Sequence, residues 1–132
     1  MNAFLVELEN KPGALAKLAE AIATKGVNIT GVSGTSCDTG GRVAIVTADD
    51  ATTRTVLQGL SHSFKEFEVT EAPLRDEPGS LAKATRRLAE AGVNIEAIFP
   101  TGMSGRDISV AFVTNNPSKA REALAVATGS VR

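Results

Sequence analysis

Two Pro-Gly turns, each followed by a helix-forming run, are the segments of this sequence best suited to bind a small anion. Pro12-Gly13 precedes Ala14-Leu15-Ala16-Lys17, and Pro78-Gly79 precedes Ser80-Leu81-Ala82-Lys83. A helix that begins at such a turn leaves its first backbone N–H groups without partners, and the positive end of its dipole favours a carboxylate. Because glycine has no Cβ, a ligand can approach the backbone closely. We therefore expect a ligand-binding loop at each turn.

Three asparagines near these turns carry amides that suit both charged groups of an amino acid. Asn10 precedes the first turn, and Asn28 and Asn94 each follow a Gly-Val pair. Their side chains offer neutral donor and acceptor atoms for an ammonium and a carboxylate. A structural interpretation stays open beside this one, since Pro-Gly serves turns and an asparagine after a helix-ending glycine often bonds the local backbone.

Catalytic chemistry has little support in the residue types present. Cys37 is the only cysteine and His62 the only histidine, so Cys37 has a single candidate nitrogen base. The chain carries no CxxC, histidine cluster, paired catalytic carboxylates or P-loop. We expect a protein that is not an enzyme and holds no metal or cofactor.

Composition excludes several classes of partner. The 132 residues include 14 Lys+Arg against 15 Asp+Glu, with five Phe and no Trp or Tyr, which disfavours nucleic-acid binding. No apolar run approaches the ~18 residues of a membrane span. The first residues lack a basic region and reach Glu7 and Glu9 early, so we expect no signal peptide. With one cysteine, a cytoplasmic location is the expectation.

The chain repeats itself at an offset of 66 residues. Between positions 12 and 29, ten of eighteen residues are identical to those 66 positions later, including PGxLAK and GVNI. The sequence therefore predicts two domains of one plan, 1–67 and 68–132.

The first repeat predicts strand, helix, two strands and a second helix. Phe4, Val6 and Leu8 alternate as in a strand, and Pro12 stands where a helix starts, in its first turn. Strands are expected at 27–32 and 43–47, followed by a helix capped by Asp49 or Asp50. In the first helix, the predicted core residues are Leu15, Leu18, Ala19 and Ile22, and Gly26 is the predicted left-handed cap. In the second helix, they are Val56, Leu57 and Leu60.

The second repeat predicts the same order. Leu81, Ala84 and Leu88 form the helical stripe, strands follow at 94–99 and 108–114, and Asn116-Pro117 starts the last helix. The segment 64–74 must supply both the last strand of one repeat and the first of the next. Only Thr128 to Val131 remain for the final strand, which we expect to be short.

A βαββαβ order predicts an α+β fold, two tandem ferredoxin-like sandwiches in which an antiparallel sheet carries its helices on one face. Each half lies near the lower size limit for independent stability. We expect a homodimer, because exposed edge strands need covering and twofold dimers are the commonest assembly.

The two runs that recur in both halves resemble the signature of the ACT domain family. They are Glu9-Asn10-Lys11-Pro12-Gly13-Ala14-Leu15 with Gly26-Val27-Asn28-Ile29, and Asp76-Glu77-Pro78-Gly79-Ser80-Leu81 with Gly92-Val93-Asn94-Ile95. The resemblance implies a βαββαβ regulatory module for amino acids, as in phosphoglycerate dehydrogenase. A tandem without a catalytic domain is similar to the family's stand-alone regulatory proteins, and the small subunit of acetolactate synthase is another relative.

The resemblance also implies which residues touch the ligand. In serine-binding relatives, equivalent asparagines contact it across an interface between two domains, which assigns that role to Asn10, Asn28 and Asn94. The relatives' histidine before the turn is absent, and Leu8 stands near its place. The candidate contact residues are Asn10, Lys11, Gly13, Ala14, Leu15, Asn28 and Ile29 in the first repeat, and Asp76, Gly79, Ser80, Leu81, Asn94 and Ile95 in the second.

Two functions remain in competition. The first is a sensor that binds an amino acid or similar metabolite and signals to a metabolic enzyme. The second is a subunit that docks on such an enzyme without a ligand of its own. If the sensor is right, the site at Asn10 and Lys11 should bind more tightly than the site at Asp76 and Glu77, whose carboxylates oppose an incoming anion.

Overall fold

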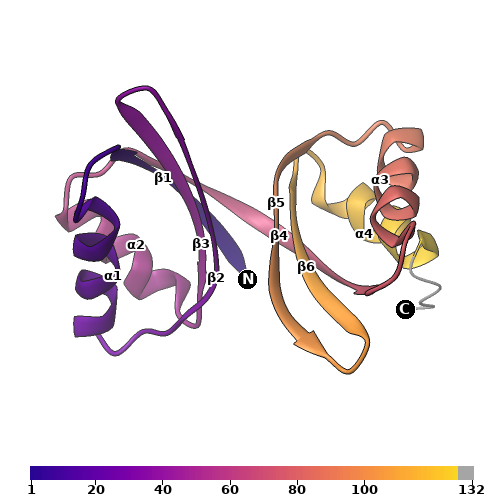
Figure 1. The fold of residues 1–132 in the computed structure, drawn as a ribbon, viewed down its shortest axis with the longest axis horizontal. Helices are drawn as coiled ribbons and strands as arrows, with labels where there is room; N and C mark the ends of the chain where they lie inside the picture. The colour runs from indigo at the N-terminus through magenta and orange to yellow at the C-terminus, as the bar shows by residue number, and fades with distance from the viewer. Residues whose placement is uncertain (128–132) are drawn as a thin grey trace. The chain divides into compact units, whose positions relative to one another are not determined.

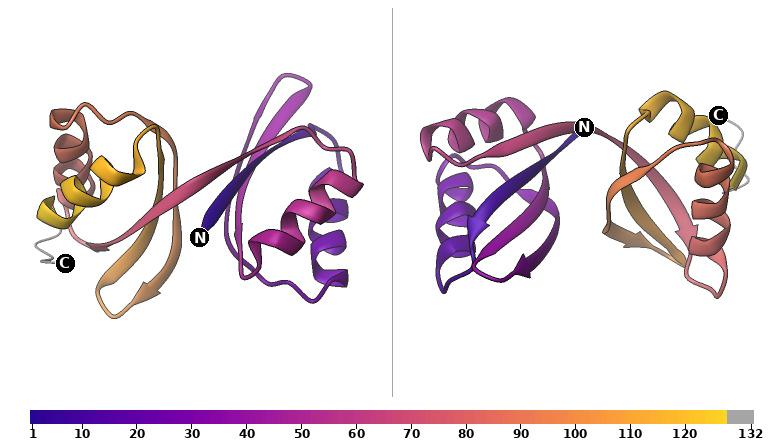
Figure 2. Two further views of the ribbon diagram at one scale, coloured as in Figure 1. Left: turned by 180° about the vertical axis from the view of Figure 1, so that it is seen from behind. Right: turned by 90° about the horizontal axis from the view of Figure 1, so that it is seen from above.

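The structure of this chain is a computed structural model that describes residues 1–127, and these form two compact units. Unit 1 runs from Met1 to Phe67 and unit 2 begins at Glu68. Figures 1 and 2 show helices on one side of the strands in each unit, so the α+β fold with tandem βαββαβ order is confirmed. The short strand predicted at Thr128 to Val131 lies outside the described residues.

Unit 1 contains four strands and two helices. The order of strands is β2-β3-β1-β4, with β1 paired antiparallel to β3 and β3 to β2. The elements are β1 (Asn2–Glu9), α1 (Ala14–Thr24), β2 (Ile29–Cys37), β3 (Gly40–Thr47), α2 (Asp50–Gly59) and the start of β4 (Phe64–Arg75). Its core is formed by Phe4, Val6, Leu18, Ile22, Val43, Ile45, Val56 and Leu57.

Unit 2 repeats this plan with the order β4-β6-β5. Its further elements are α3 (Ser80–Glu90), β5 (Ile95–Ser104), β6 (Asp107–Thr114) and α4 (Pro117–Ala127). Its core includes Ala72, Leu74, Ala84, Leu88, Val93, Val110, Phe112, Ala120, Ala123 and Leu124. The single strand β4 ends unit 1 and begins unit 2, as the sequence predicted for 64–74.

Most of the predicted caps are confirmed. Asp49 is the N-cap of α2 and accepts a hydrogen bond from the Thr52 backbone N–H at 3.0 Å. The Asn116 side chain accepts from Lys119 N–H at 3.2 Å at the start of α4. Gly26 has a φ of 74°, the left-handed conformation expected after α1.

The predicted start of each first helix was wrong by two residues. Helices α1 and α3 begin at Ala14 and Ser80, so the prolines lie in the preceding turn and do not occupy the first helical turn. The N-caps are Gly13 and Gly79, with φ of 89° and 93°. This left-handed conformation favours glycine, which explains why each proline is followed by one.

Three leucines assigned to the core from periodicity are exposed. Leu15, Leu60 and Leu81 have relative exposures of 49%, 42% and 53%. Leu15 and Leu81 lie in the first turn of their helices and Leu60 follows the last turn of α2, so all three lie at helix ends. The periodic pattern identifies the stripe on the helix but not which of its residues tertiary packing buries.

The offset between the repeats changes from 66 to 67 inside β5. Ile95 pairs with Thr114 as Ile29 pairs with Thr47, and 95 − 29 is 66, whereas the strands end at Ser104 and Cys37, and 104 − 37 is 67. The additional residue is Thr101, which lies in a register shift between Pro100 and Gly102. Its hydroxyl bonds Glu71 and Ser109. A β-bulge therefore absorbs one inserted residue without disturbing the pairs beyond it.

Candidate functional site

The loop between β1 and α1 forms a shallow hollow at the start of the helix. Lys11, Gly13 and Ala14, all predicted contact residues, line it, and its volume is about 340 Å³. Lys17 and Glu20 contribute from the exposed side of α1. The predicted residues Asn10 and Leu15 do not line it.

The start of α1 offers backbone donors to this hollow. No side chain caps α1, and among the described residues no acceptor is found for the Leu15 N–H. The Ala14 N–H reaches only the Lys11 carbonyl, at 3.3 Å, within the turn. Two lysines against one glutamate give the hollow a positive balance, and that charge adds to the helix dipole. The arrangement suits a carboxylate.

The corresponding loop of unit 2 has the same bare helix start but a different set of charges. Its hollow of about 300 Å³ is lined by the predicted Ser80, together with Arg75, Glu77, Lys83 and Asp107. The two cations and two anions balance, and Arg75 lies 3.9 Å from Asp107. Asp76, Gly79 and Leu81, also predicted, do not line this hollow. The two helix starts are therefore not equivalent.

Asn10 has a structural partner. Its side-chain amide donates to the Asp38 carbonyl at 3.0 Å, and its backbone N–H donates to Thr39 at 2.9 Å. The Asp76 N–H makes the equivalent backbone bond to Arg106, at 2.7 Å. These contacts tie each loop to the hairpin of its own unit.

The second pair of predicted asparagines lies at the other end of the first helix of each unit. The 11 residues of α1 span about 16 Å, so Asn28 cannot share a ligand with the Gly13 loop of its own unit. Asn94 is bonded locally, from its amide to Glu96 at 3.3 Å and from its N–H to the Asn115 side chain at 3.0 Å. Ile29 and Ile95 begin the strands β2 and β5 that follow.

Sequence reasoning missed several residues that line these hollows. Lys17 and Lys83 are identical at the repeat offset and lie one turn into each helix, so the repeat itself carried the signal. Asp107 is contributed by β6, and the β4–β6 pairing, in which it lies opposite Arg75, brings it next to the loop.

The part of the chain that the structure describes holds no group of three or more His, Cys, Asp or Glu side chains arranged for a metal ion. None of its helices has the length and apolarity to cross a membrane. The only cysteine, Cys37, is exposed at the end of β2, and His62 is half-buried after α2.

One plan of antiparallel strands with two helices on one face occurs twice in this chain, each time with an uncapped helix start after the first strand, which defines a tandem of small α+β modules. The sequence matches the family described as ACT domain pair over residues 1–129, and the chain belongs to this family. Among curated proteins none matches this sequence.

Solved structures share this fold. Protein BT0572 from Bacteroides thetaiotaomicron matches with a TM-score of 0.81 at 22% identity, over 95% of this chain and 86% of that one. The ligand-free regulatory subunit of aspartate kinase from Thermus thermophilus gives 0.71 at 19% identity, over 99% and 91%. A structure of aspartokinase alpha and beta subunits gives 0.69 at 22% identity, over 97% and 93%.

Proposed function

We propose that this chain is a cytoplasmic, non-catalytic regulatory module that binds an amino acid at the start of α1. The observation that carries the proposal is the bare helix start in both units, where a left-handed glycine replaces a capping side chain and a lysine follows one turn later. Regulatory subunits of aspartate kinase among the proteins of similar fold support a role in amino-acid metabolism.

The site of unit 1 is proposed to be the tighter one. Lys11 and Lys17 line its hollow against Glu20, and although Glu9 pairs with Lys11 at 3.0 Å, Lys17 makes no such ion pair among the described residues, whereas the charges that line the unit 2 hollow cancel. Asp76 adds a further negative charge to the second loop. A carboxylate is therefore attracted more strongly to unit 1.

Calorimetry and thermal unfolding with each proteinogenic amino acid test this proposal. A ligand at about 100 times its Kd should add about 2.7 kcal/mol to the free energy of unfolding. Lys17→Ala should weaken binding about tenfold or more, as loss of a charge-assisted hydrogen bond does, and Lys83→Ala should change it little. The opposite ranking contradicts the assignment to unit 1.

Substitution of the residues before the turn is a second comparison. Asn10→Ala should lose most of the affinity and Asp76→Ala little. Because the Asn10 amide also holds the Asp38 carbonyl, the free energy of unfolding of Asn10→Ala must be measured in parallel. Asp38 supplies only its backbone to that bond, and its φ is 54°, so Asp38→Asn, which removes the charge with a residue that tolerates this conformation, is the control that leaves the tie intact.

The alternative function is a subunit that docks on a metabolic enzyme without binding a ligand, as in the comparison with the small subunit of acetolactate synthase. Absence of any thermal shift with every amino acid would favour it. The sensor proposal would then be abandoned, while the regulatory class would stand.

The outer edge of β2, which pairs with no other described strand, supports the proposal of a homodimer. β2 ends the order of strands in unit 1, and its nine residues contain no charge and no proline, the features that usually protect an edge. Val32 on this strand is 51% exposed. By contrast, β5 carries Glu96, Pro100 and two register shifts, against one in β2.

Sedimentation tests the dimer. The chain of 13.6 kDa should sediment as a species of twice that mass, and Val32→Lys should shift it to the monomer. Ile98→Lys on β5 is the matched control and should leave the dimer intact. A wild-type monomer at micromolar concentration contradicts the proposal.

A further inference from the structure

A second hollow lies at the hairpin end of the unit 1 sheet, apart from the helix start. Its volume is about 570 Å³, within the range of small-molecule sites, and strands β1, β2 and β3 line it. We call it the hairpin hollow; ten residues line it, and six of them, Glu7, Glu9, Thr35, Cys37, Gly40 and Arg42, carry the argument below. It shares no lining residue with the hollow at Lys11 and Gly13.

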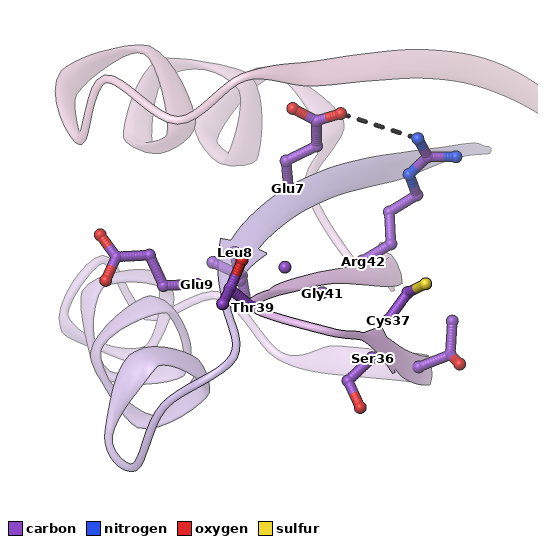
Figure 3. A pocket seen from close by; sticks show the side chains of 10 residues that line it. Glu7, Leu8, Glu9, Ser36, Cys37, Thr39, Gly41 and Arg42 are labelled. Carbon is purple, nitrogen blue, oxygen red and sulfur yellow. Dashed lines mark ion pairs between the residues drawn. The ribbon is translucent and has the colours of Figure 1, made fainter.

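The register of the sheet places these six residues on the same face. Arg42 of β3 pairs with Glu7 on one side and Thr35 on the other, and Gly40, two residues earlier, pairs with Glu9 and Cys37. Figure 3 shows Glu7 and Arg42 pointing to the same side, with Ser36 pointing the opposite way. Gly40 has no side chain, which leaves space between Glu9 and Cys37.

Unit 2 carries different residues at the same place. The strand pair equivalent to Glu9 and Gly40 is Arg75 and Asp107, whose side chains form an ion pair at 3.9 Å. The pair equivalent to Glu7 and Arg42 is Pro73 and Ser109, which carries no charge. The hairpin hollow with its charges is thus a feature of unit 1 alone among the described residues.

The charges of the hairpin hollow match those of a zwitterion. Arg42 Nη2 lies 3.7 Å from Glu7 Oε1, near the limit of an ion pair, and both side chains are more than half exposed. No further partner of the Arg42 guanidinium is found among residues 1–127, so its fork of N–H groups remains available for a carboxylate. Glu7 would then accept from an ammonium group.

We propose that the hairpin hollow binds a zwitterionic α-amino acid, with its carboxylate on Arg42 and its ammonium on Glu7. The ligand opens a weak, solvent-exposed ion pair and replaces it with two oppositely charged contacts, so little is lost when it enters. The hydroxyl of Thr35 and the thiol of Cys37 face the rest of the ligand. This site does not depend on binding at the start of α1.

Cys37 provides a specific readout of this site because it is the only cysteine and is exposed. Iodoacetamide, a neutral reagent, alkylates it at a rate that mass spectrometry measures. We expect at least one of the proteinogenic amino acids to slow alkylation about tenfold at about ten times its Kd. The ratio of rates with and without ligand is compared within each variant, which removes direct effects on thiol reactivity.

Three variants locate the protection. Arg42→Ser, the residue of unit 2, should abolish it, and Arg106→Ser, which removes an arginine from the hairpin of unit 2, should leave it unchanged. Glu9→Arg with Gly40→Asp copies the ion pair of unit 2 and should also abolish it. A Cβ at Gly40 meets only the Cys37 carbonyl, at 3.8 Å, so the strand tolerates this change.

Two results overturn the proposal. One is that no amino acid slows alkylation of Cys37, and the other is that protection persists in Arg42→Ser. Lys17→Ala separates this inference from the proposed function, because it should leave protection of Cys37 unchanged. If calorimetry detects binding that Lys17→Ala weakens while Cys37 stays unprotected, the hairpin site is wrong and the function proposed for the helix start stands.

Discussion

The two units place their aromatic core residue on different strands. In unit 1 Phe4 of β1 lies opposite Ile45 of β3, and in unit 2 Thr70 of β4 lies opposite Phe112 of β6. All four are buried, and Phe4 also contacts Phe64, with 6.0 Å between ring centroids. Paired residues of an antiparallel sheet point to the same face, so each unit combines one large and one smaller side chain at the same place in its core. Both units therefore fill this part of the core, although the aromatic side chain comes from β1 in unit 1 and from β6 in unit 2.

The loops differ in the same manner. Unit 1 pairs Glu9 with Lys11 at 3.0 Å, whereas the equivalent positions of unit 2 carry Arg75 and Glu77, with the signs reversed. Arg75 contacts Asp107 of the neighbouring strand at 3.9 Å. The backbone plan is shared while the electrostatic surroundings of each helix start are not, so the two candidate sites need not bind the same ligand.

The largest expected effect comes from exchanging the core pair. Phe4→Thr alone should lower the free energy of unfolding of unit 1 by about 4 kcal/mol, since it leaves a cavity and buries a hydroxyl. Phe4→Thr with Ile45→Phe recreates the pair of unit 2 and should recover part of that loss. Urea unfolding of both singles and the double gives the coupling energy. Strict additivity would show that the pair does not share one volume.

The next effect concerns the glycines at the helix starts. Their φ values of 89° and 93° are costly for any residue with a Cβ, so Gly13→Val and Gly79→Val should each destabilise their unit by about 2 kcal/mol. The obstacle is conformational, since a Cβ at either position meets no atom within 4 Å. Gly59→Ala, in a position without positive φ, is the control and should not destabilise in thermal unfolding.

The positive φ angles of Gly13 and Gly79 limit what substitutions at these glycines can show about ligand binding. From the sequence alone, we expect a valine at Gly13 to block a ligand while the fold survives. The left-handed backbone shows that loss of binding in Gly13→Val could follow from a displaced helix start. Substitution of Lys17 avoids this ambiguity, because its side chain is exposed on a regular helix.

The repeat, the order of elements and most caps could be predicted, because periodicity, Pro-Gly turns and Asp49 or Asn116 act over short distances along the chain. The exposure of Leu15 could not, because it depends on tertiary packing around the first turn of α1. The bulge at Thr101 was also hidden, since the ten identities lie in 12–29 and their partners, before the offset changes.

Lining residues contributed by another strand escaped prediction for a similar reason. Asp107 reaches the loop of unit 2, and Arg42 the hairpin hollow, only through strand register. The sequence carries the residue types, but the pairing decides which of them meet.

The third prediction compares two buried threonines. Thr70, 6% exposed, has an Oγ1 without a partner among the described residues, whereas Thr53 Oγ1 bonds Thr47 Oγ1 at 2.7 Å and the Asp49 carbonyl at 2.8 Å. Thr70→Val removes an unsatisfied hydroxyl and should stabilise by about 1 kcal/mol. Thr53→Val removes the bonds of this hydroxyl to Thr47 and to the Asp49 carbonyl and should destabilise by a similar amount. Chemical denaturation measures both, and effects of the same sign would contradict the comparison.

The smallest expected effect concerns two ion pairs, one in each unit. Each joins the second helix of its unit to the sheet of that unit. Arg54 and Arg121 both lie five residues after an N-cap, at Asp49 and Asn116. Arg54 donates from Nε and Nη2 to the two Glu66 oxygens at 2.7 Å each, and the Asn2 amide adds a bond at 2.6 Å. Within residues 1–127, Arg121 makes one ion-pair contact, to Glu68 at 3.1 Å, between exposed side chains.

Lowering the pH should distinguish the contribution of the Arg54–Glu66 pair to stability from that of the Arg121–Glu68 pair. The hydrogen bonds from Arg54 lower the pKa of Glu66 from 4.5 to about 2, despite the opposing effect of its burial. A carboxylate with a lowered pKa in the folded state stabilises above its unfolded pKa, and this contribution is lost as the pH falls from about 4.5 towards 2. Glu66→Gln should therefore be less stable than the wild type at neutral pH, by up to about 1 kcal/mol for a pair that is partly exposed, and this difference in stability should close towards pH 2.

Glu68→Gln is the matched control and should change the free energy of unfolding at neutral pH by less than Glu66→Gln does. Urea unfolding across this pH range measures both, and a gap for Glu66→Gln that stays constant down to pH 2 would show that the pair with Arg54 does not carry the effect.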